Sequence, residues 1–261
     1  MIIDCHTHIF ESGRGGPFDL PSGSDDLVRQ MDGYNVDVSI VLPLPGDATN
    51  EFVHQECARF PDRLVGLYTP EFNVPSETIR RMESFFERHC PRGLKIHPRR
   101  QDVTVEQPLV NEVLAWAAER ALPVLFDVFP FGPSLTNLAT HPLAYSQVAQ
   151  RFPNLKMVLA HSGGFRLMDA FLVAKSHHGV HLDLSFTPVY FKGSSVAADC
   201  SFLCRRLPAG RVLYGSDFPS VPFRDSMDAV RALLEGVDAA MCNEVMGDAA
   251  ARLFGISSRN D

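Results

Sequence analysis

Short stretches rich in aliphatic and β-branched residues alternate with longer amphipathic stretches along the whole chain. This alternation is typical of strand–helix units that build a parallel sheet. Eight strands are predicted, over residues 2–9, 37–44, 64–71, 93–98, 123–129, 156–162, 180–186 and 211–217. Helices are expected between them, among them residues 75–89 and 107–121, and residues 243–254 should form a closing helix.

Eight such units fit one (β/α)₈ TIM barrel, an α/β fold, over residues 1–261. No Ser-, Gly- or Pro-rich linker and no change in composition marks a second domain. A doubly wound open sheet is the alternative fold.

The composition, with 45% hydrophobic and 21% charged residues, is that of a packed globular chain. The net charge is −7 and the Lys and Arg residues are scattered, so no nucleic-acid partner is expected. No apolar stretch approaches the length of a membrane span, and the amino terminus does not look like a signal peptide, so no membrane partner is expected either. The six cysteines are too dilute for a disulfide scaffold, which favours a cytoplasmic protein.

Polar side chains stand out at the carboxyl ends of the predicted strands, because a parallel barrel buries both faces of each strand. In the first strand, Asp4, His6 and His8 share one face. Two histidines that are two residues apart on one face of a strand can bind the same metal ion. His161 ends the sixth strand, and Asp217 ends the eighth, where a buried carboxylate needs a cation or hydrogen-bond donors. Singly, His161 could be a core residue and Asp217 a helix cap. Together these strand-end residues predict a site at one rim of the barrel.

Two further strands carry polar residues toward the same rim. Lys95 and His97 lie two residues apart and should face the same way, where they would bind a substrate carboxylate or polarise a carbonyl. Asp127 lies in an apolar strand, so it needs either a metal ion or the ammonium of Lys95 as its partner. Arginines in adjacent loops are either further anion contacts or solvated surface charge: Arg99, Arg100 and Arg166.

The loop over residues 128–133 is rich in phenylalanine and proline. At the mouth of a barrel, such a loop either forms a wall of the substrate pocket or makes a hydrophobic contact between subunits. The expected partner is a small-molecule substrate, and a homo-oligomer is compatible with the sequence.

This constellation resembles the amidohydrolase superfamily, in particular the branch called amidohydrolase-related or amidohydrolase 2. The resemblance spans the chain and rests on D-C-H-T-H at 4–8, G-L-K-I-H-P at 93–98, L-A-H-S-G-G at 159–164, G-S-D-F-P at 215–219 and the closing helix at 244–255. It implies that His6 and His8 bind a metal ion, that Asp217 is a ligand or general base, and that His161 is a ligand or an acid/base. Most metal-dependent members end the fifth strand in a histidine, and here Asp127 would replace it as a ligand. The implied ion is Zn²⁺, with Mn²⁺ as the alternative.

These features predict a metal-dependent hydrolase of a small cyclic or carboxylated substrate, an amide or a lactone. The metal would acidify the attacking water, and Asp217 would accept its proton. The same residues would also serve a non-oxidative decarboxylase of an aromatic or enoic acid. Some lactonases of this family lack the fifth-strand histidine and work without metal, which makes a metal-independent lactonase another alternative. A non-enzymatic binding barrel is disfavoured because His6, His8, His161 and Asp217 are all intact.

Overall fold

The computed structural model, which describes residues 1–131 and 140–257, contains all eight expected barrel strands. In chain order they are β1 (Ile3–Thr7), β4 (Val38–Val41), β5 (Leu64–Gly66), β6 (Leu94–Ile96), β7 (Val124–Asp127), β8 (Met157–Ala160), β9 (Val180–Asp183) and β10 (Val212–Leu213). The pairings among them are parallel. Each strand is shorter than the predicted stretch.

The strands form two hydrogen-bonded groups, β1-β4-β5 and β10-β9-β8-β7-β6. Isolated parallel bridges join the two groups at both gaps, Tyr68 with Leu94 and Thr7 with Phe218. At the first gap, the backbone N–H of Tyr68 donates to the carbonyl oxygen of Gly93 at 3.0 Å. At the second gap, the N–H of Asp217 donates to the carbonyl oxygen of His6 at 2.8 Å. The chain therefore has the expected TIM-barrel fold rather than a doubly wound open sheet.

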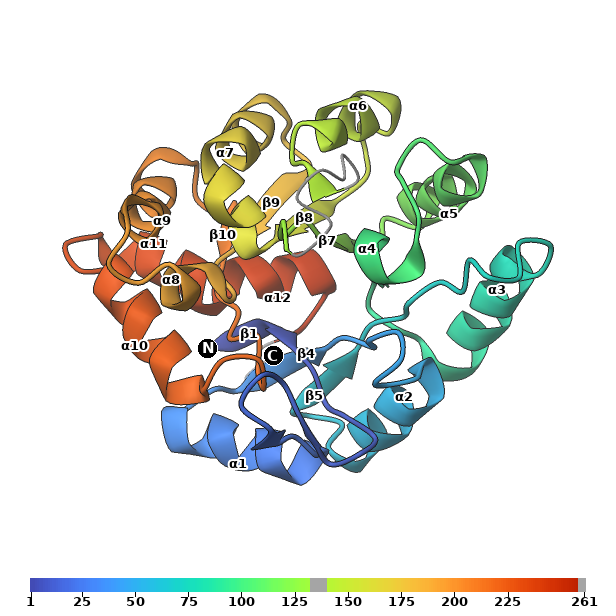
Figure 1. The fold of residues 1–261 in the computed structure, drawn as a ribbon, viewed down its shortest axis with the longest axis horizontal. Coiled ribbons are helices and arrows are strands. Elements are labelled where there is room, and N and C mark those ends of the chain that lie inside the picture. Colours follow the sequence, from blue (N-terminus) through green and yellow to red (C-terminus); the bar gives the residue numbers. More distant parts are fainter. Residues whose placement is uncertain (132–139, 258–261) are drawn as a thin grey trace.

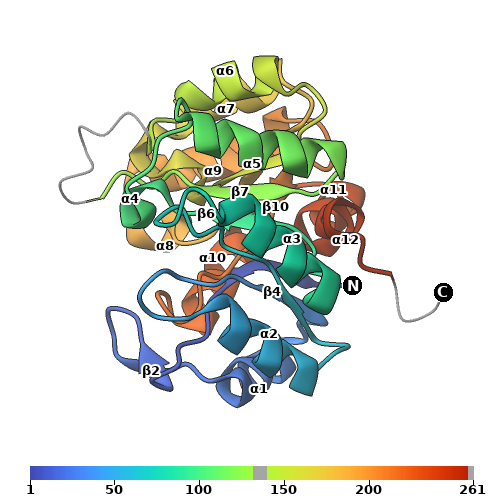
Figure 2. The ribbon, with the colours of Figure 1, turned by 90° about the vertical axis from the view of Figure 1, so that its right-hand side faces the viewer.

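Helices surround the strands in both ribbon views (Figures 1 and 2). The longer ones are α1 (Ser24–Tyr34), α2 (Asn50–Arg59), α3 (Thr78–His89), α5 (Pro108–Glu119), α6 (Ala144–Arg151), α7 (Leu167–Ser176), α9 (Ser195–Arg206) and α10 (Phe223–Leu233). Two short helices, α4 (Pro98–Gln101) and α8 (Thr187–Tyr190), follow β6 and β9. None of the helices in the described part of the chain has the length and apolar character that a bilayer span requires.

The closing helix differs from the single helix expected over residues 243–254. It consists of α11 (Ala239–Asn243), a π-helical turn (Glu244–Asp248) and α12 (Ala249–Phe254). A Cβ atom on Gly247 would lie only 2.2 Å from the carbonyl oxygen of Met1, so the backbone of this turn presses directly against the start of β1. The irregular turn thus allows α12 to pack against the first strand of the barrel.

A small antiparallel hairpin after β1 was not predicted. Its strands are β2 (Arg14–Gly15) and β3 (Leu20–Pro21), and Phe18 lies at its tip. The hairpin packs against the segment after β10, because a Cβ atom on Gly16 would lie 2.7 Å from the carbonyl oxygen of Pro219. It therefore carries Phe18 to the edge of the pocket described below.

Gly93 offers a test of the gap between β5 and β6. A Cβ atom there would lie 2.6 Å from the carbonyl oxygen of Pro123. We predict that Gly93→Ala lowers the free energy of unfolding by about 2 kcal/mol, because overpacking against backbone forces strands apart. Gly33→Ala in α1 is the control: nothing lies within 4 Å of its Cβ position, so it should stabilise the protein by up to about 1 kcal/mol. Urea unfolding measures both, and equal effects would contradict the packing argument.

Candidate active site

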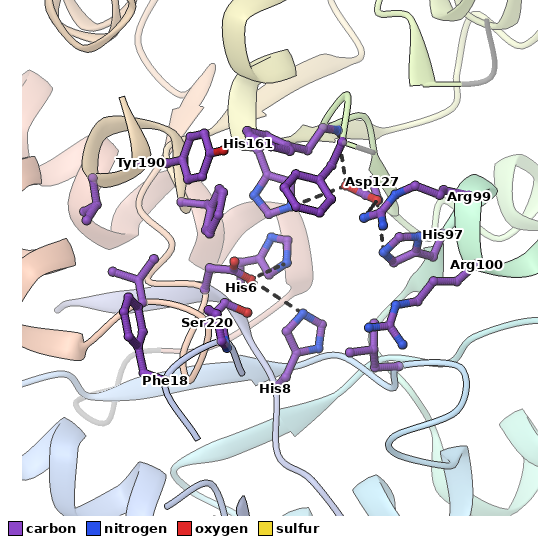
Figure 3. A pocket seen from close by; sticks show the side chains of 18 of the residues that line it. His6, His8, Phe18, His97, Arg99, Arg100, Asp127, His161, Tyr190 and Ser220 are labelled. Carbon is purple, nitrogen blue, oxygen red and sulfur yellow. Dashed lines mark hydrogen bonds and ion pairs between the residues drawn. The ribbon is translucent and has the colours of Figure 1, made fainter. Parts of the chain in front are cut away.

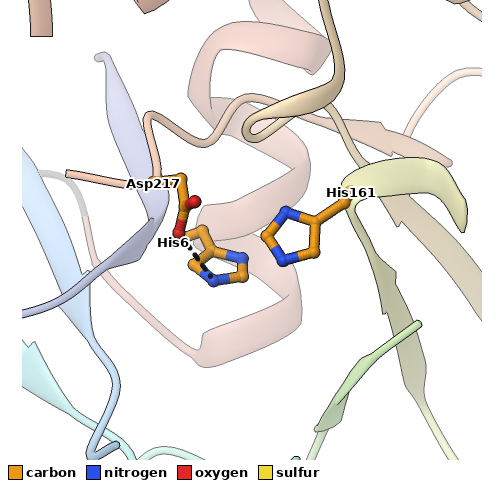
Figure 4. A group of neighbouring side chains, drawn as sticks. All are labelled: His6, His161 and Asp217. Atoms are coloured by element: carbon orange, nitrogen blue, oxygen red, sulfur yellow. Dashed lines mark ion pairs between the residues drawn. The ribbon is translucent and has the colours of Figure 1, made fainter. Parts of the chain in front are cut away.

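Three buried donor side chains meet at the carboxyl end of the barrel (Figure 4). The ligand atoms of His6, His161 and Asp217 all lie within 4.8 Å of one another. His6 Nε2 is 3.5 Å from Asp217 Oδ1, and His8 Nε2 is 3.7 Å from the same oxygen. His6 near the end of β1, His8 directly after it and Asp217 after β10 thus face one point, while His161 approaches it from the end of β8.

Each of the three histidines has its Nδ1 next to an oxygen acceptor. These acceptors are Asp183 Oδ2 for His6 at 3.0 Å, Leu42 O for His8 at 2.9 Å and Ser185 Oγ for His161 at 2.9 Å. When Nδ1–H donates a hydrogen bond, Nε2 keeps the lone pair that a metal ion binds. His6 Nε2 is a buried atom without a hydrogen-bond partner in residues 1–131 and 140–257. The arrangement therefore suits metal ligation by His6 and His8, whereas His161 Nε2 faces Asp127 Oδ1 at 3.4 Å.

Asp183 and Ser185, at the end of β9, hold these histidines and were missed in the sequence analysis. Asp183 Oδ1 accepts the backbone N–H groups of His161 at 2.8 Å and of Ser185 at 3.0 Å, and it also accepts the Ser185 hydroxyl. Both residues lie within the predicted strand 180–186. The rule that singled out Asp217, a polar residue at the carboxyl end of a buried strand, would have found them.

The backbone turns sharply where the site residues leave the sheet. His161, Ser162 and Asp217 have φ values of 58°, 48° and 59°, which lie in the left-handed region although none of them is glycine. The hydroxyl of Thr187 donates to the carbonyl oxygen of His161 at 2.5 Å and helps to hold this turn. As a result the ring of His161 lies beside the ring of His6, with 4.7 Å between their centroids.

Asp127 lies at the end of β7, outside the group of three donors. Its Oδ2 is 3.0 Å from His97 Nε2 and 3.5 Å from Arg99 Nη2, and its Oδ1 is 3.4 Å from His161 Nε2 (Figure 3). No ion pair within 4 Å joins it to Lys95 in the described part of the chain. The structure thus pairs this carboxylate with His97, Arg99 and His161, not with the lysine that the sequence suggested as one partner.

Burial shifts the proton affinities of the site residues in different directions. It lowers the pKa of His6 to about 3, and the charge of Lys95 adds to the effect. It raises the pKa of Asp217 to about 6, although His161 and Lys95 oppose the shift. Burial alone would lower the pKa of His161, but its hydrogen bond with Asp127 and the charge of Asp217 outweigh burial and raise it. A neutral His6 suits metal binding, whereas Asp217 and His161 suit proton transfer.

These side chains lie at the floor of a pocket of about 500 Å³. Figure 3 shows Phe18 and Tyr190 on one side of it and His97, Arg99 and Arg100 on the other. Lys95 also lines the pocket. The short helices α4 and α8 bring the arginines and Tyr190 to the rim. The site is therefore open to a small molecule that has a charged and an apolar part.

Two expectations about the loops have different outcomes. Phe129 and Phe131 line the pocket, which is one of the two roles expected for the loop over residues 128–133, whose last two residues lie outside the described residues. Arg166, expected as an anion contact, is absent from the described pocket lining. It directly precedes α7, and its guanidinium carbon lies 5.4 Å from the ring centroid of Phe165. The local turn directs this side chain toward Phe165 instead of the pocket.

A family model described as Amidohydrolase matches residues 3–256. None of the curated proteins compared with the chain matches it.

Solved structures share the fold at low sequence identity. A probable 2-pyrone-4,6-dicarboxylic acid hydrolase from Acinetobacter baumannii, with citric acid bound, has a TM-score of 0.76 at 15% identity and covers 97% of this chain and 99% of its own. An amidohydrolase from Burkholderia multivorans, with bound zinc, has a TM-score of 0.76 at 15% identity, covering 98% of this chain and 100% of its own. A 5-carboxyvanillate decarboxylase from Sphingomonas paucimobilis has a TM-score of 0.73 at 17% identity, and the match covers 98% of this chain and 99% of the decarboxylase. At 15–17% sequence identity, these structural similarities are evidence for the fold alone.

Ser185 provides a test of the hydrogen-bonded support around the histidines. We predict that Ser185→Ala weakens Zn²⁺ binding about 10- to 100-fold, because loss of a partner that orients a ligating histidine has effects of this size. Ser194→Ala is the matched control, since its exposed hydroxyl donates to Phe191 O, away from the pocket lining. Competition with a chromogenic chelator gives both affinities, and an unchanged affinity in Ser185→Ala would show that the hydroxyl does not support the site.

Proposed function

The chain belongs to the amidohydrolase family, whose model spans nearly all of it, and on this premise we propose that it is a metal-dependent hydrolase. The substrate in this proposal is a small cyclic or carboxylated molecule with an amide or lactone bond. The observation that carries the proposal is the convergence of donor atoms from His6, His161 and Asp217 within 4.8 Å at the floor of a pocket.

The residues present fit a metal ion. The imidazole nitrogen of His6 and a carboxylate oxygen of Asp217 are ligands that suit Zn²⁺, with Mn²⁺ as the alternative, while His161, whose Nε2 faces Asp127, lies beside them as a proton donor. His8 joins the set in this proposal because its Nε2 faces Asp217 at 3.7 Å. A buried nitrogen without a hydrogen-bond partner in the described part of the chain, such as His6 Nε2, costs free energy that a bound cation would offset. The zinc in the Burkholderia neighbour supports the same choice of ion. A bound Zn²⁺ supplies Lewis acidity, which acidifies water and polarises a carbonyl group.

In this proposal, Asp217 and His161 each carry out one proton transfer. Asp217, with a pKa of about 6, is ionised in most molecules at neutral pH and accepts the proton of the attacking water. His161 keeps its own proton through its contact with Asp127 and donates it to the departing oxygen or nitrogen. Asp127 acts here as a positioning carboxylate and not as a replacement ligand, because its two oxygens contact His97, Arg99 and His161.

Decarboxylation is the second candidate. The observation that favours it is the place of His161, whose ring meets the aromatic wall of the pocket at Phe129, with centroids 5.7 Å apart, and at Phe186, with centroids 6.0 Å apart. There it could deliver a proton to the ring carbon of an aromatic acid. The decarboxylase among the structural neighbours supports the same alternative. A metal-independent lactonase is distinguished from both by metal content.

We predict that His6→Ala lowers the metal content of protein purified without chelator to less than about a tenth of the wild-type value, because it removes the central nitrogen donor. The exposed His178 supplies the control, and His178→Ala should retain the wild-type content. Elemental analysis gives the metal content, and thermal melts within a few degrees of wild type would show that both variants fold. Metal retained in His6→Ala would place the ion elsewhere. A wild-type protein without metal would support the metal-independent lactonase.

For Asp217→Asn we predict a kcat lowered about 10²- to 10⁴-fold, the usual contribution of a general base, with KM changed much less. The substrate comes from a screen of lactones, amides and aromatic carboxylates with the Zn²⁺-loaded enzyme. Asp228→Asn, in the exposed part of α10, is the matched control. Release of acid identifies the reaction as hydrolysis, whereas release of CO₂ alone would show that the reaction is a decarboxylation. A wild-type kcat in Asp217→Asn would exclude Asp217 as the base.

A further inference from the structure

Lysine is rare in this chain, and one of its lysines is buried. The sequence has 4 Lys and 20 Arg. Lys156, Lys175 and Lys192 are at least partly exposed, whereas Lys95 is only 1% exposed and lines the pocket. Arginine cannot lose its proton in a protein, but a buried lysine can. The chain thus keeps a lysine, rather than its usual arginine, at a buried position where a basic residue faces the pocket.

The side chain of Lys95 points into the barrel. Its neighbours in β6, Leu94 and Ile96, pack in the core cluster that includes the surrounding helices. Side chains alternate along a strand, so Lys95 faces the other way, toward the interior. The residue opposite it in β7 is Leu125, which belongs to the apolar cluster inside the barrel together with Cys5. The stem of the lysine therefore lies among apolar side chains, and its end reaches the pocket.

In the described part of the chain, the amine of Lys95 has no direct partner, because no hydrogen bond and no ion pair within 4 Å involves it. Asp127, Asp183 and Asp217 act on it from a longer distance and oppose the effect of burial, but burial prevails and lowers the pKa of the amine. An ordinary lysine amine is neutral in only roughly one molecule in a few thousand at pH 7. A desolvated lysine is a stronger nucleophile because more of it is neutral.

Groups that can move protons line the same pocket. Asp217 and His161 both lie in its lining, and their ligand atoms are within 4.8 Å of each other. When an amine attacks a carbonyl group, an acid must protonate the oxygen and a base must accept a proton from the nitrogen. The pocket therefore holds a nucleophile, an acid and a base, which are the groups that imine formation requires.

We propose that Lys95 is a nucleophile that forms an imine with a small aldehyde or ketone, as an activity of this pocket in addition to the proposed hydrolysis. The lone pair of the neutral amine forms a C–N bond, and the carbonyl oxygen takes a proton from His161. Asp217 accepts a proton from the nitrogen and passes it to the new hydroxyl group, which leaves as water while the C=N bond forms. An amine, a carbonyl compound and one proton thus give a protonated imine and water.

Reductive trapping on the zinc-loaded protein tests this proposal directly. The protein is incubated at pH 7 with acetone and sodium cyanoborohydride, which reduces an imine to a stable isopropylamine, and peptide mass spectrometry then locates the adduct. We expect at least about tenfold more adduct on Lys95 than on any other lysine, because a larger fraction of its amine is neutral. The lysines at 156, 175 and 192 are controls within the same sample.

Oxygen exchange tests whether the imine forms and hydrolyses repeatedly. Each cycle replaces the carbonyl oxygen by oxygen from water, so the wild-type protein should speed the entry of ¹⁸O from labelled water into acetone, as followed by ¹³C NMR. Lys95→Arg keeps a cation in the pocket but cannot form the imine, and it should lower the catalysed rate at least about tenfold. The control Lys175→Met, exposed at the end of α7, should change it less than about twofold.

Adduct spread evenly over the four lysines would overturn the proposal, and this experiment needs no variant. A wild-type exchange rate in Lys95→Arg would overturn it as well. Because neither measurement involves hydrolysis, the result is separable from the proposed function. Trapping on Lys95 that persists after chelator treatment, in a protein that hydrolyses nothing, would support this inference and contradict the proposed function alone.

Discussion

The buried carboxylate of Asp183 accepts hydrogen bonds from four groups that come from three different strand ends. They are the Nδ1–H of His6, the backbone N–H of His161, and the N–H and hydroxyl of Ser185. A carboxylate without water is tolerated only when such donors surround it. This requirement fixes the tautomer of His6 and brings the end of β8 against the ends of β9 and β1. The geometry of the candidate metal ligands therefore depends on a residue that is not one of them.

The first strand serves the fold and the site together. Asp4 Oδ1 accepts the backbone N–H groups of His6 at 3.1 Å and of Ser216 at 2.9 Å, and so it links β1 to the segment after β10. That link lies at one of the two gaps between the hydrogen-bonded groups of strands. Asp217 and His6 meet across the same gap through their backbone bond. Closing the barrel thus brings the carboxylate of Asp217 to the histidines of β1.

Sequence patterns predicted the parts of the molecule that depend on burial. The eight strands were predictable because both faces of each must be aliphatic, and His6, His8, His161 and Asp217 stood out as exceptions. The same rule applies to Asp183 and Ser185, which are polar residues at the carboxyl end of the predicted strand 180–186. The hairpin with Phe18, the direction of Arg166 and the partners of Asp127 depend on how loops pack against other elements. Asp127 contacts Arg99 only because α4 starts directly after His97, a local turn that the alternation of apolar residues does not encode.

Desolvation explains why neighbouring groups at this rim acquire different chemistry. Excluding water disfavours every charged form, so it makes His6 neutral and Asp217 easier to protonate. His161 escapes this trend because the carboxylate of Asp127 lies 3.4 Å from its Nε2. Placing Asp127 with His97 and Arg99 also keeps that carboxylate ionised against burial, since charge and hydrogen bonds from His97 and His161 hold its pKa well below the usual range. The position of one carboxylate at the end of β7 thus raises the pKa of His161, whereas the neighbouring His6 stays neutral and keeps the lone pair of Nε2.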